Sequence, residues 1–405
     1  MAFGVSQVRV GVVGLGTIGR QELELWHVGG FATVGHDLST SVVEELSGSY
    51  SGVKDPPALT TAADALHECD VLVLCLPTAS AGGGISLRAF DDFIDVRKAG
   101  QWRADQLTIV ASTVPIGFSR DLASRIGVTR LAHAPERFDP GRPVTLGTIP
   151  RVVGGTTNEA RDAAIAYYGR VGVSASGTSS LEVAEASKLL ENAFRLVNIA
   201  LANEFAALCQ RIGVSTGEII QAAASKPFGF MPHYPGPGAG GMCIPVVPLF
   251  LLEAARTLDM DLPILSAAIH SNDAQPDRVV GWIEEIVKGD TPRARILVIG
   301  ATYKANYPDT RGSAALKLID RLAGRYETAV CDPIVNQADL PTSVTLHRTL
   351  PDEDYDLAVI ALRHESVDLQ TIGRLAPVVM DLTRGEIRGA AAPSRERTSK
   401  VGAPQ

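Results

Sequence analysis

The stretch Val8-Arg9-Val10-Gly11-Val12-Val13-Gly14-Leu15-Gly16-Thr17-Ile18-Gly19 decides the fold of the first part of this 405-residue chain. It is an apolar, β-branched run that ends in a GxGxxG turn and leads into a helical pattern. A second apolar run, Ala32–His36, ends at Asp37, 18 residues after Gly19. In this order the glycines let a pyrophosphate approach a helix N-terminus, and the acid accepts hydrogen bonds from ribose hydroxyls. The sequence predicts an N-terminal Rossmann domain.

The same residues indicate the cofactor. A GxGxxG turn by itself is a weak signal, because glycines also serve tight packing, but the strand before it and the acid after it favour a dinucleotide site. Asp37 would repel a 2′-phosphate, so NAD is expected in place of NADP. The residues expected to bind NAD are those of the turn and the acid, namely Gly14, Gly16, Thr17, Ile18, Gly19 and Asp37.

Further apolar runs alternate with helical segments in both halves of the chain. They are residues 71–76, 107–112, 151–154, 295–299, 328–331, 357–361 and 378–382. Apolar runs of this length, separated by helices, are typical of buried parallel strands. The predicted fold is therefore α/β, with two Rossmann-like doubly wound parallel-sheet domains joined by a long central helix.

The central helix is predicted over Leu181–Ile212, which contains no glycine or proline and repeats apolar residues at helical spacing. Ser179 and Glu182 have the spacing of a capping box, and Gly213 is expected to end the helix. At 1.5 Å per residue the helix would be about 48 Å long, which is more than one domain needs. We expect its apolar face to pack against a second subunit, in a homodimer.

Composition excludes several classes of protein. A net charge of -8 argues against a general nucleic-acid surface, and no apolar run is long enough to span a membrane. The five cysteines form no CxxC pair and the eight histidines form no HxxxH spacing, so we expect reduced thiols and no metal site. The N-terminus has no signal-peptide pattern. These features together predict a cytoplasmic enzyme that binds neither nucleic acid nor membrane.

Two groups of residues allow a catalytic and a passive interpretation. Cys243 lies in Gly240-Gly241-Met242-Cys243-Ile244-Pro245, within residues 227–248, which hold six prolines and five glycines and predict a rigid, irregular loop. Such a loop can hold a nucleophilic thiol, or carry a passive one. Lys188 and Asn192 share a helix face with Glu185 and Arg195. The pattern by itself favours a solvated polar stripe; the alternative is a pair of donors for an oxyanion.

The motifs taken together resemble the UDP-glucose/GDP-mannose dehydrogenase family, from about Val8 to Leu382, with bacterial enzymes for UDP-N-acetylhexosamines or UDP-glucose most similar. Besides the N-terminal fingerprint, the resemblance rests on Ser112-Thr113-Val114-Pro115, Ala134-Pro135-Glu136-Arg137, Glu185-Ala186-Ser187-Lys188-Leu189-Leu190-Glu191-Asn192, Lys226-Pro227-Phe228-Gly229-Phe230-Met231-Pro232, Tyr234-Pro235-Gly236-Pro237-Gly238, Cys243-Ile244-Pro245 and Tyr303-Lys304 with Asp309, Arg311 and Ser313.

The resemblance implies NAD-dependent, four-electron oxidation of the C6 alcohol of a nucleotide sugar, with a UDP sugar favoured. It implies that Cys243 captures the aldehyde as a thiohemiacetal, which becomes a thioester and is hydrolysed. The residues implied to be catalytic are Cys243, Lys188, Asn192, Glu136 and Thr113. Further residues implied to bind the cofactor are Pro77, Thr78, Thr113 and Lys304. Those implied to bind substrate are Glu136, Arg137, Lys188, Asn192, Lys226, Phe230, Tyr234, Gly236, Gly240, Tyr303, Lys304 and Arg311, the last by reaching into a partner's site.

The predicted elements, together with the resemblance, divide the chain into domains. Residues 1–178 would be the NAD-binding Rossmann domain and 179–278 a central helical dimerisation domain that carries the cysteine loop. Residues 279–388 would bind the nucleotide sugar, and the Ala/Pro/Ser/Arg-rich residues 389–405 would form a disordered tail.

Two positions depart from the family pattern. Met242 stands where the family loop has a histidine, and Val247 where it has an aspartate that assists proton transfer. A valine can neither accept nor donate a proton. Three functions therefore stay open: complete oxidation to the acid, oxidation that stops at the aldehyde or thiohemiacetal, and a non-catalytic protein that binds NAD and a nucleotide sugar.

Overall fold

The computed structural model of the protein describes residues 8–79, 84–97, 102–138, 146–287 and 294–389. They form two compact units. The first runs up to Glu191 and includes Leu249–Asp259, and the second contains Asn192–Pro248 and the residues from Met260 onward. The predicted boundaries after 178 and 278 stay predictions. Of the predicted tail 389–405, Gly389 instead ends the strand Glu386–Gly389, and residues 390–405 lie outside the described residues.

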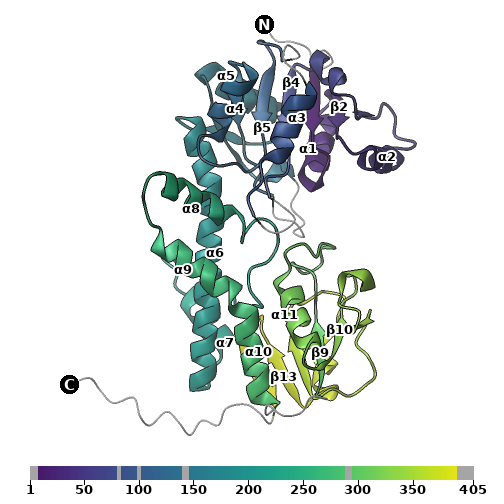
Figure 1. Ribbon diagram of the computed structural model, residues 1–405, viewed down its shortest axis with the longest axis vertical. Helices are drawn as coiled ribbons and strands as arrows, with labels where there is room; N and C mark the ends of the chain where they lie inside the picture. The colour runs from purple at the N-terminus through teal and green to yellow at the C-terminus, as the bar shows by residue number, and fades with distance from the viewer. Residues whose placement is uncertain (1–7, 80–83, 98–101, 139–145, 288–293, 390–405) are drawn as a thin grey trace, which may run out of the picture. The chain divides into compact units, whose positions relative to one another are not determined.

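The first unit is built on a sheet of which Figure 1 labels β2, β4 and β5. Its strand order is β3-β2-β1-β4-β5-β6-β7-β8. Neighbouring strands are parallel except β6 and β7, which are antiparallel. The strands are β1 Arg9–Val13, β2 Ala32–His36, β3 Ala58–Thr60, β4 Val71–Leu74, β5 Leu107–Val110, β6 Leu131–His133, β7 Arg151–Gly155 and β8 Ala175–Gly177. The helices are α1 Thr17–Val28, α2 Thr40–Ser49, α3 Arg88–Arg97, α4 Phe118–Ile126 and α5 Asn158–Arg170.

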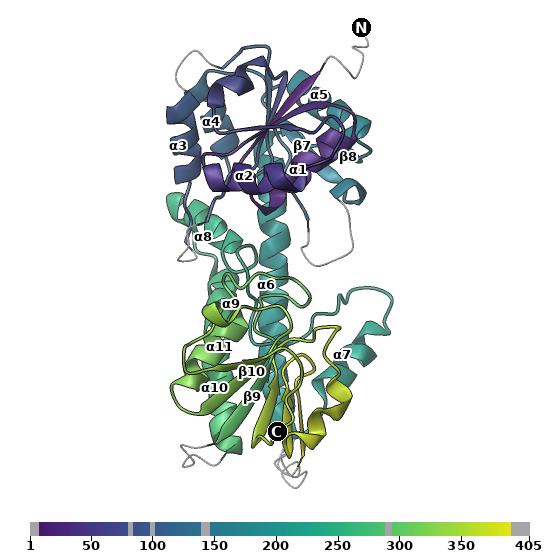
Figure 2. The same cartoon turned by 90° about the vertical axis from the view of Figure 1, so that its right-hand side faces the viewer.

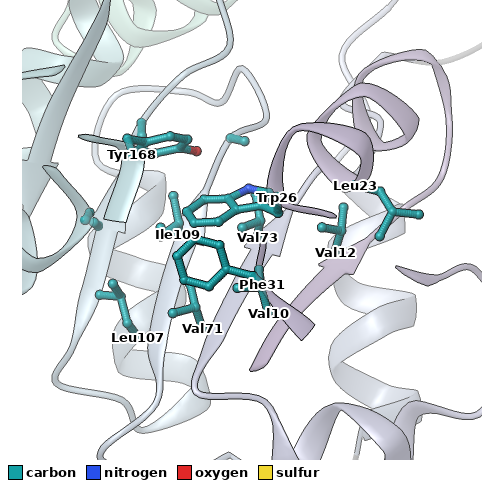
Figure 3. Packing of buried hydrophobic residues seen from close by; sticks show 14 of the residues in the cluster. Val10, Val12, Leu23, Trp26, Phe31, Val71, Val73, Leu107, Ile109 and Tyr168 are labelled. Atoms are coloured by element: carbon teal, nitrogen blue, oxygen red, sulfur yellow. The ribbon is translucent and has the colours of Figure 1, made fainter. Parts of the chain in front are cut away.

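Apolar side chains cover both faces of this sheet. On one face Val10 and Val12 of β1 contribute to a core with Trp26 of α1 and Tyr168 of α5 (Figure 3). The rings of Trp26 and Tyr168 lie 5.2 Å apart. On the other face Val13 belongs to a second cluster that includes aromatic residues of α3 and α4. Because side chains alternate along a strand, burial on both faces requires the continuous apolar runs seen in the sequence.

The second unit contains a sheet in the order β11-β10-β9-β12-β13-β14, parallel except for the pair β13 and β14. Helices α10 and α11 lie on one side of it (Figure 2). The strands are β9 Arg295–Ile299, β10 Glu327–Cys331, β11 Thr345–His347, β12 Leu357–Ile360, β13 Val378–Asp381 and β14 Glu386–Gly389. The helices that follow α6 along the chain are α7 Thr216–Ala224, α8 Val247–Thr257, α9 Pro263–Asp273, α10 Gln275–Ile286 and α11 Ala314–Ala323.

The predicted fold class is confirmed, and α6 covers Leu181–Ile212 as predicted. Gly213, with φ of 71°, follows its last turn. The predicted cap is one residue off, because Ser180 precedes the helix and its Oγ accepts from the Val183 amide at 3.3 Å. Glu182 instead pairs with Arg120.

The irregular loop is shorter than the predicted residues 227–248, because α8 begins at Val247. Five short strands, β3, β6, β8, β11 and β14, were not predicted, because three or four residues do not show a period. Within the described ranges no helix is both long and apolar enough to cross a membrane.

Candidate functional site

The turn after β1 has the geometry of a dinucleotide cradle. Gly14 has φ of +85°, and a Cβ there would lie 2.8 Å from the Cys75 carbonyl oxygen. A Cβ on Gly19 would lie 1.6 Å from the Gly14 oxygen, whereas a Cβ on Gly16 would meet nothing within 4 Å. Gly14 and Gly19 are therefore required by the fold. Gly16 faces open space in which a ligand backbone can approach.

Two further features of this turn suit a dinucleotide. Helix α1 begins at Thr17 after Gly16, which offers no side-chain cap, so the first amides remain donors for an anion. The Asp37 carboxylate is half-buried and is held by the Leu15 amide at 2.8 Å and the Ser39 amide at 2.9 Å. Each oxygen accepts one of these bonds and keeps a lone pair for a further donor. These residues therefore fit NAD.

The other expected cofactor residues follow neighbouring strands of the same sheet. Pro77 and Thr78 come after β4, and Thr113 comes after β5. Pro77 is exposed, and the other two are half-buried. Because parallel strands end at one edge of the sheet, these residues lie along the edge to which Gly14 also belongs.

Glu136 and Lys188 place a buried carboxyl group and a positive charge near each other in the first unit. Glu136 follows β6, is 7% exposed, and donates its amide to the Ala111 carbonyl oxygen at 3.0 Å. Burial raises the pKa of its carboxyl, and the positive charge of the half-buried Lys188 acts in the opposite direction. An acid whose proton affinity is tuned by burial and a neighbouring cation is typical of general acid–base sites.

The polar face of α6 is not a solvated stripe, and that interpretation of the sequence was wrong. Glu185 is 1% and Asn192 is 5% exposed, while Arg195 is exposed. The Glu185 carboxylate accepts from the amides of Gly117 at 2.6 Å and Ser119 at 2.8 Å. It therefore caps the start of α4, a role that a helix pattern alone does not reveal.

Arg137, an expected substrate residue, is engaged within the first unit. Its Nη2 donates to Glu191 Oε1 at 2.6 Å, and its Nη1 donates to the Pro150 carbonyl oxygen at 2.9 Å. The guanidinium is thus held in one orientation by an acid and a backbone group.

Cys243, in the second unit, is exposed. Its carbonyl oxygen accepts from the Val247 amide at 2.9 Å, so it lies one turn before the body of α8. Cys69, Cys209 and Cys331 are buried, and burial raises the pKa of Cys69 and Cys331 to about 11. Cys75 is partly buried, and desolvation raises its pKa well above the usual value. Exposure therefore distinguishes Cys243 as the thiol that a substrate can reach.

The cysteine loop is seated on the loop that carries Tyr303. Gly241 has φ of +84° and donates its amide to the Gly312 carbonyl oxygen at 3.1 Å. A Cβ on Gly241 would lie 2.8 Å from a ring carbon of Tyr303, and one on Gly240 would lie 3.0 Å from the Gly312 oxygen. The two glycines let these loops approach more closely than any larger residue would allow.

Three side-chain amides hold the loop before Cys243. Asn203 Oδ1 accepts from the Gly236 amide at 2.8 Å, and Gln275 Nε2 donates to the Gly236 oxygen at 3.1 Å. Asn272 both accepts from and donates to Ala239, at 2.6 and 3.2 Å. All three amides are buried. Sequence reasoning missed them, although isolated amides on largely apolar helices were the available signal.

The remaining loop residues expected to bind substrate do not share one pocket. Phe230 lines an apolar groove of about 280 Å³ with residues of α6 and α7. Tyr234 lines a separate cavity of about 460 Å³ that includes Arg363 and Arg384. Lys226 is exposed, and its Nζ lies 4.7 Å from the centre of the Phe228 ring.

The loop after β9 holds the expected nucleotide residues. The Tyr303 amide donates to the Asp309 carbonyl oxygen at 3.0 Å, and the Asp309 carboxylate pairs with Arg311 at 2.6 Å. Lys304 is half-buried, and the Arg311 side chain is largely exposed. Asp309, which the sequence indicated only as part of the family motif, therefore connects Tyr303 and Arg311 within this loop.

A buried pair, Asp332 and His364, holds the backbone of the loop after β9. Asp332 Oδ2 accepts from the Ala301 amide at 2.8 Å and lies 3.0 Å from His364 Nε2. His364 Nδ1 accepts from the Asn306 amide at 3.1 Å, so Nε2 carries the proton that Asp332 accepts. Burial opposes ionisation of Asp332, but His364 and the backbone donors outweigh it and lower its pKa to about 2. Within the described residues no cluster of three or more His, Cys, Asp or Glu could hold a metal ion.

Comparison with known proteins finds consistent relatives. The family model described as "UDP-glucose/GDP-mannose dehydrogenase family, central domain" matches residues 182–274, and the one described as its "UDP binding domain" matches residues 297–384. UDP-N-acetyl-D-mannosamine dehydrogenase of Pyrococcus horikoshii is 30% identical over 91% of this chain and 93% of its own length. UDP-N-acetyl-D-glucosamine 6-dehydrogenase of Pseudomonas aeruginosa is 27% identical over 93% and 97%.

Solved structures agree in fold. The structure of the Pyrococcus horikoshii UDP-D-ManNAc dehydrogenase has a TM-score of 0.80, is 28% identical, and covers 94% of this chain and 96% of that one. A UDP-glucose dehydrogenase from Pyrobaculum islandicum, 23% identical, has a TM-score of 0.81 over 95% and 96%. The resemblance predicted from the motifs is confirmed, and with it the prediction of a nucleotide-sugar dehydrogenase.

Proposed function

This chain belongs to the UDP-glucose/GDP-mannose dehydrogenase family, and from that premise we propose that it oxidises the C6 alcohol of a UDP-linked sugar to the uronic acid with NAD. The observation that carries the proposal is Cys243: an exposed thiol on a loop held by three buried amides and two close glycine contacts. A pure binding protein has no need of an exposed, rigidly held thiol.

The chemistry at Cys243 proceeds through two carbon–sulfur species. Loss of a hydride from C6 and a proton from its hydroxyl gives an aldehyde, and the thiolate adds to its carbon to form a thiohemiacetal. Loss of a second hydride from that carbon, with the proton of its hydroxyl, gives a thioester. Water then attacks the carbonyl carbon, the C–S bond breaks, and the acid and the thiolate are released. The turn of Gly14 to Gly19 would hold NAD, which accepts one hydride per molecule, so two NAD molecules would be used in succession.

Further polar groups are proposed to take part in the reaction. Lys188 and Asn192 on α6 are proposed to stabilise the oxyanions and to orient the attacking water, with Thr113 as a further hydroxyl donor. Glu136 is proposed to hold the proton that the water gives up, for which its raised pKa is suited. In the second unit, Tyr303, Lys304 and Arg311 are proposed to bind the nucleotide, with Lys304 at the diphosphate.

The cofactor assignment has its own test. Asp37 keeps a half-exposed carboxylate at the place where an NADP 2′-phosphate would be bound. We expect NAD to bind at least about tenfold more tightly than NADP, because the charges repel. Calorimetric titration of both cofactors measures the difference, and equal affinities would overturn the assignment.

The substrate class is supported by the relatives, whose names refer to UDP-N-acetyl-D-mannosamine and UDP-N-acetyl-D-glucosamine. A panel of UDP and GDP sugars, with NADH and acid measured in parallel, tests the whole proposal. Two NADH per acid is the expected result.

Replacing Cys243 with Ser should lower acid formation by roughly 10⁴-fold while calorimetry still detects NAD binding. Undiminished acid formation in Cys243→Ser would overturn the covalent route.

A second candidate is oxidation that stops before hydrolysis. Val247, in the position of the family aspartate, is 4% exposed and lies one turn after Cys243. This buried apolar side chain cannot transfer a proton. If it limits turnover, intact-protein mass spectrometry with substrate and NAD would show a covalent adduct that accumulates, and Val247→Asp would shorten its lifetime. Formation of one NADH for each aldehyde released supports this candidate. Binding of NAD and a nucleotide sugar without formation of NADH supports a non-catalytic protein.

A homodimer is proposed from the exposed face of α6. In the second unit its apolar residues Phe194, Leu201, Phe205, Leu208 and Ile212 are between 36% and 62% exposed. They follow one another at helical spacing and continue into the apolar groove beside α7. A contiguous apolar surface of this kind is stable in water when a second copy covers it. Light scattering that gives a monomer at all concentrations would exclude the dimer.

A further inference from the structure

An ion pair lies fully inside the first unit, where the proposed chemistry does not use it. Glu22 of α1 and Arg151 of β7 contact each other with side chains 0% and 2% exposed. Trp26 Nε1 donates to Glu22 Oε2 at 3.1 Å, and the guanidinium lies 4.8 Å from the centre of the Tyr168 ring. A buried ion pair of this kind adds little net stability, because an apolar pair of the same size serves a core as well or better.

The pair is connected to the segment that carries Glu136. Arg151 Nη1 donates to the Ala134 carbonyl oxygen at 3.0 Å, two residues before Glu136. The Glu136 amide is in turn bonded to the Ala111 oxygen at 3.0 Å. The main chain on both sides of Pro135 is therefore held by a buried guanidinium and by the backbone residue that follows β5.

We infer that Glu22 and Arg151 are a positioning pair for the reaction: they fix the chain that leads to Glu136, and each offsets the charge that the other places near its carboxyl group. The inference rests on the proposed role of Glu136. The pair acts through Glu136 and its main chain, without contact to substrate.

The charges around Glu136 give the pair a measurable signature. Burial raises the pKa of Glu136, Lys188 on α6 and Arg151 lower it, and Glu22 raises it. Cys75 and Tyr168 face Arg151 from the end of β4 and from α5. Because Arg151 and Glu22 have opposite signs, their effects on Glu136 oppose each other while the pair is intact. Neutralising one member should leave the charge of the other unbalanced, so the two single variants should have opposite effects.

The experiment compares Glu22→Gln, Arg151→Met and the double variant. The titration of the Glu136 carboxyl is followed by infrared difference spectroscopy against the same protein with Glu136→Gln. Glu22→Gln should lower the titration midpoint, Arg151→Met should raise it, each by at least about half a pH unit, and the double variant should return close to wild type. Arg125→Met, which removes an exposed pair with Asp91 in the same unit, is the matched control and should not move the midpoint.

The outcomes separate this inference from the proposed function. Midpoints that stay at the wild-type value, or that move in the same direction in both single variants, overturn the positioning pair. If the midpoints move in opposite directions but the pH dependence of kcat does not change with them, the inference about the ion pair is supported. The proposed catalytic role of Glu136 is then contradicted. If Arg151→Met does not fold, Glu22→Gln decides alone, because glutamine keeps the size and the acceptor for Trp26: a lower midpoint supports the inference and an unchanged one overturns it.

Discussion

Two turns of this chain, one in each unit, are built from the same parts. Gly14 after β1 and Gly300 after β9 both have φ of 85°. Each donates its amide to the last residue of the next strand, at 2.8 and 3.0 Å. The acid that follows that strand, Asp37 or Asp332, accepts from the amide just after the glycine, at 2.8 Å in both units. A right-handed strand–turn–helix unit requires this tight turn whether or not a ligand binds there.

The two turns differ in what surrounds the acid. Asp37 is half-buried, and α1 begins three residues after Gly14, so a helix N-terminus faces the open side of Gly16. Asp332 is fully buried against His364, and α11 begins only at Ala314. The second turn therefore supports a long loop in place of a phosphate cradle. The strand–glycine–acid pattern specifies the architecture, and the exposure of the acid and the length of the loop distinguish a ligand site from a structural one.

The largest effect should come from removing the buried acid. Asp332→Ala leaves His364 and the Ala301 amide without their acceptor inside the protein. We expect a loss of about 3 to 5 kcal/mol in the free energy of unfolding. Asp37→Ala, the matched change in the first turn, should cost roughly 1 to 2 kcal/mol because water can enter the half-exposed position that the carboxylate leaves. Denaturant unfolding measures both, and equal losses would contradict the distinction between the two acids.

The two glycines should behave alike. Gly14→Ala and Gly300→Ala each place a Cβ at positive φ, within 2.8 Å of the Cys75 oxygen and 2.5 Å of the Leu362 Cβ. Each should lower the free energy of unfolding by about 2 to 3 kcal/mol. Gly48→Ala in α2, where a Cβ would meet nothing within 4 Å, is the control and should be neutral or slightly stabilising. A much smaller loss at Gly300 would show that the second turn relaxes.

The depressed pKa of Asp332 predicts a loss of stability in acid. Its folded pKa of about 2 is below the ordinary value of 3.8, so its contribution is fully present above about pH 4. That contribution is lost as the pH falls towards 2, and amounts to roughly 2 kcal/mol. Unfolding free energies of the wild type and Asp332→Asn, compared between pH 7 and pH 3, should therefore converge as the pH falls. Parallel curves would argue against a depressed pKa.

The smallest effect concerns the ligand alone. Gly16 has φ of -69° and open space above it, so Gly16→Ala should leave the fold intact. The added methyl group would occupy the approach to the helix N-terminus and weaken NAD binding by about tenfold or more, or roughly 1.4 kcal/mol. Calorimetry with NAD, together with an unchanged Tm, checks this expectation. Unaltered affinity would mean that the dinucleotide does not approach this glycine.

Much of this architecture could be predicted from local patterns. The long buried strands show as apolar runs, and α6 shows as 32 residues without glycine or proline, so their limits are correct to within two residues. The GxGxxG turn with Asp37 also carries its signal within one βαβ unit. Cys243 was the candidate nucleophile on sequence grounds, and the structure adds that its side chain is exposed. These features depend on residues close together in the chain.

Other features depended on distant partners. Glu185 looked like part of a solvated stripe because a helix pattern cannot show that the start of α4, 66 residues earlier, needs a cap. The amides that hold the cysteine loop come from 33 and 39 residues away. The only local signal, an isolated amide on a largely apolar helix, is weak, since an asparagine on a helix is most often a surface residue.

The sequence by itself determined where the longer apolar strands and the central helix lie, where the dinucleotide turn lies, and which family the chain resembles, because those signals are periodic or contiguous. Only the tertiary structure decided which polar residues are buried and with whom they pair. Glu22 and Arg151 are 129 residues apart, and Asp332 and His364 are 32 apart. Burial makes a polar side chain dependent on a matching partner, and that partner is chosen by the packing of elements far apart in the chain, which no local pattern records.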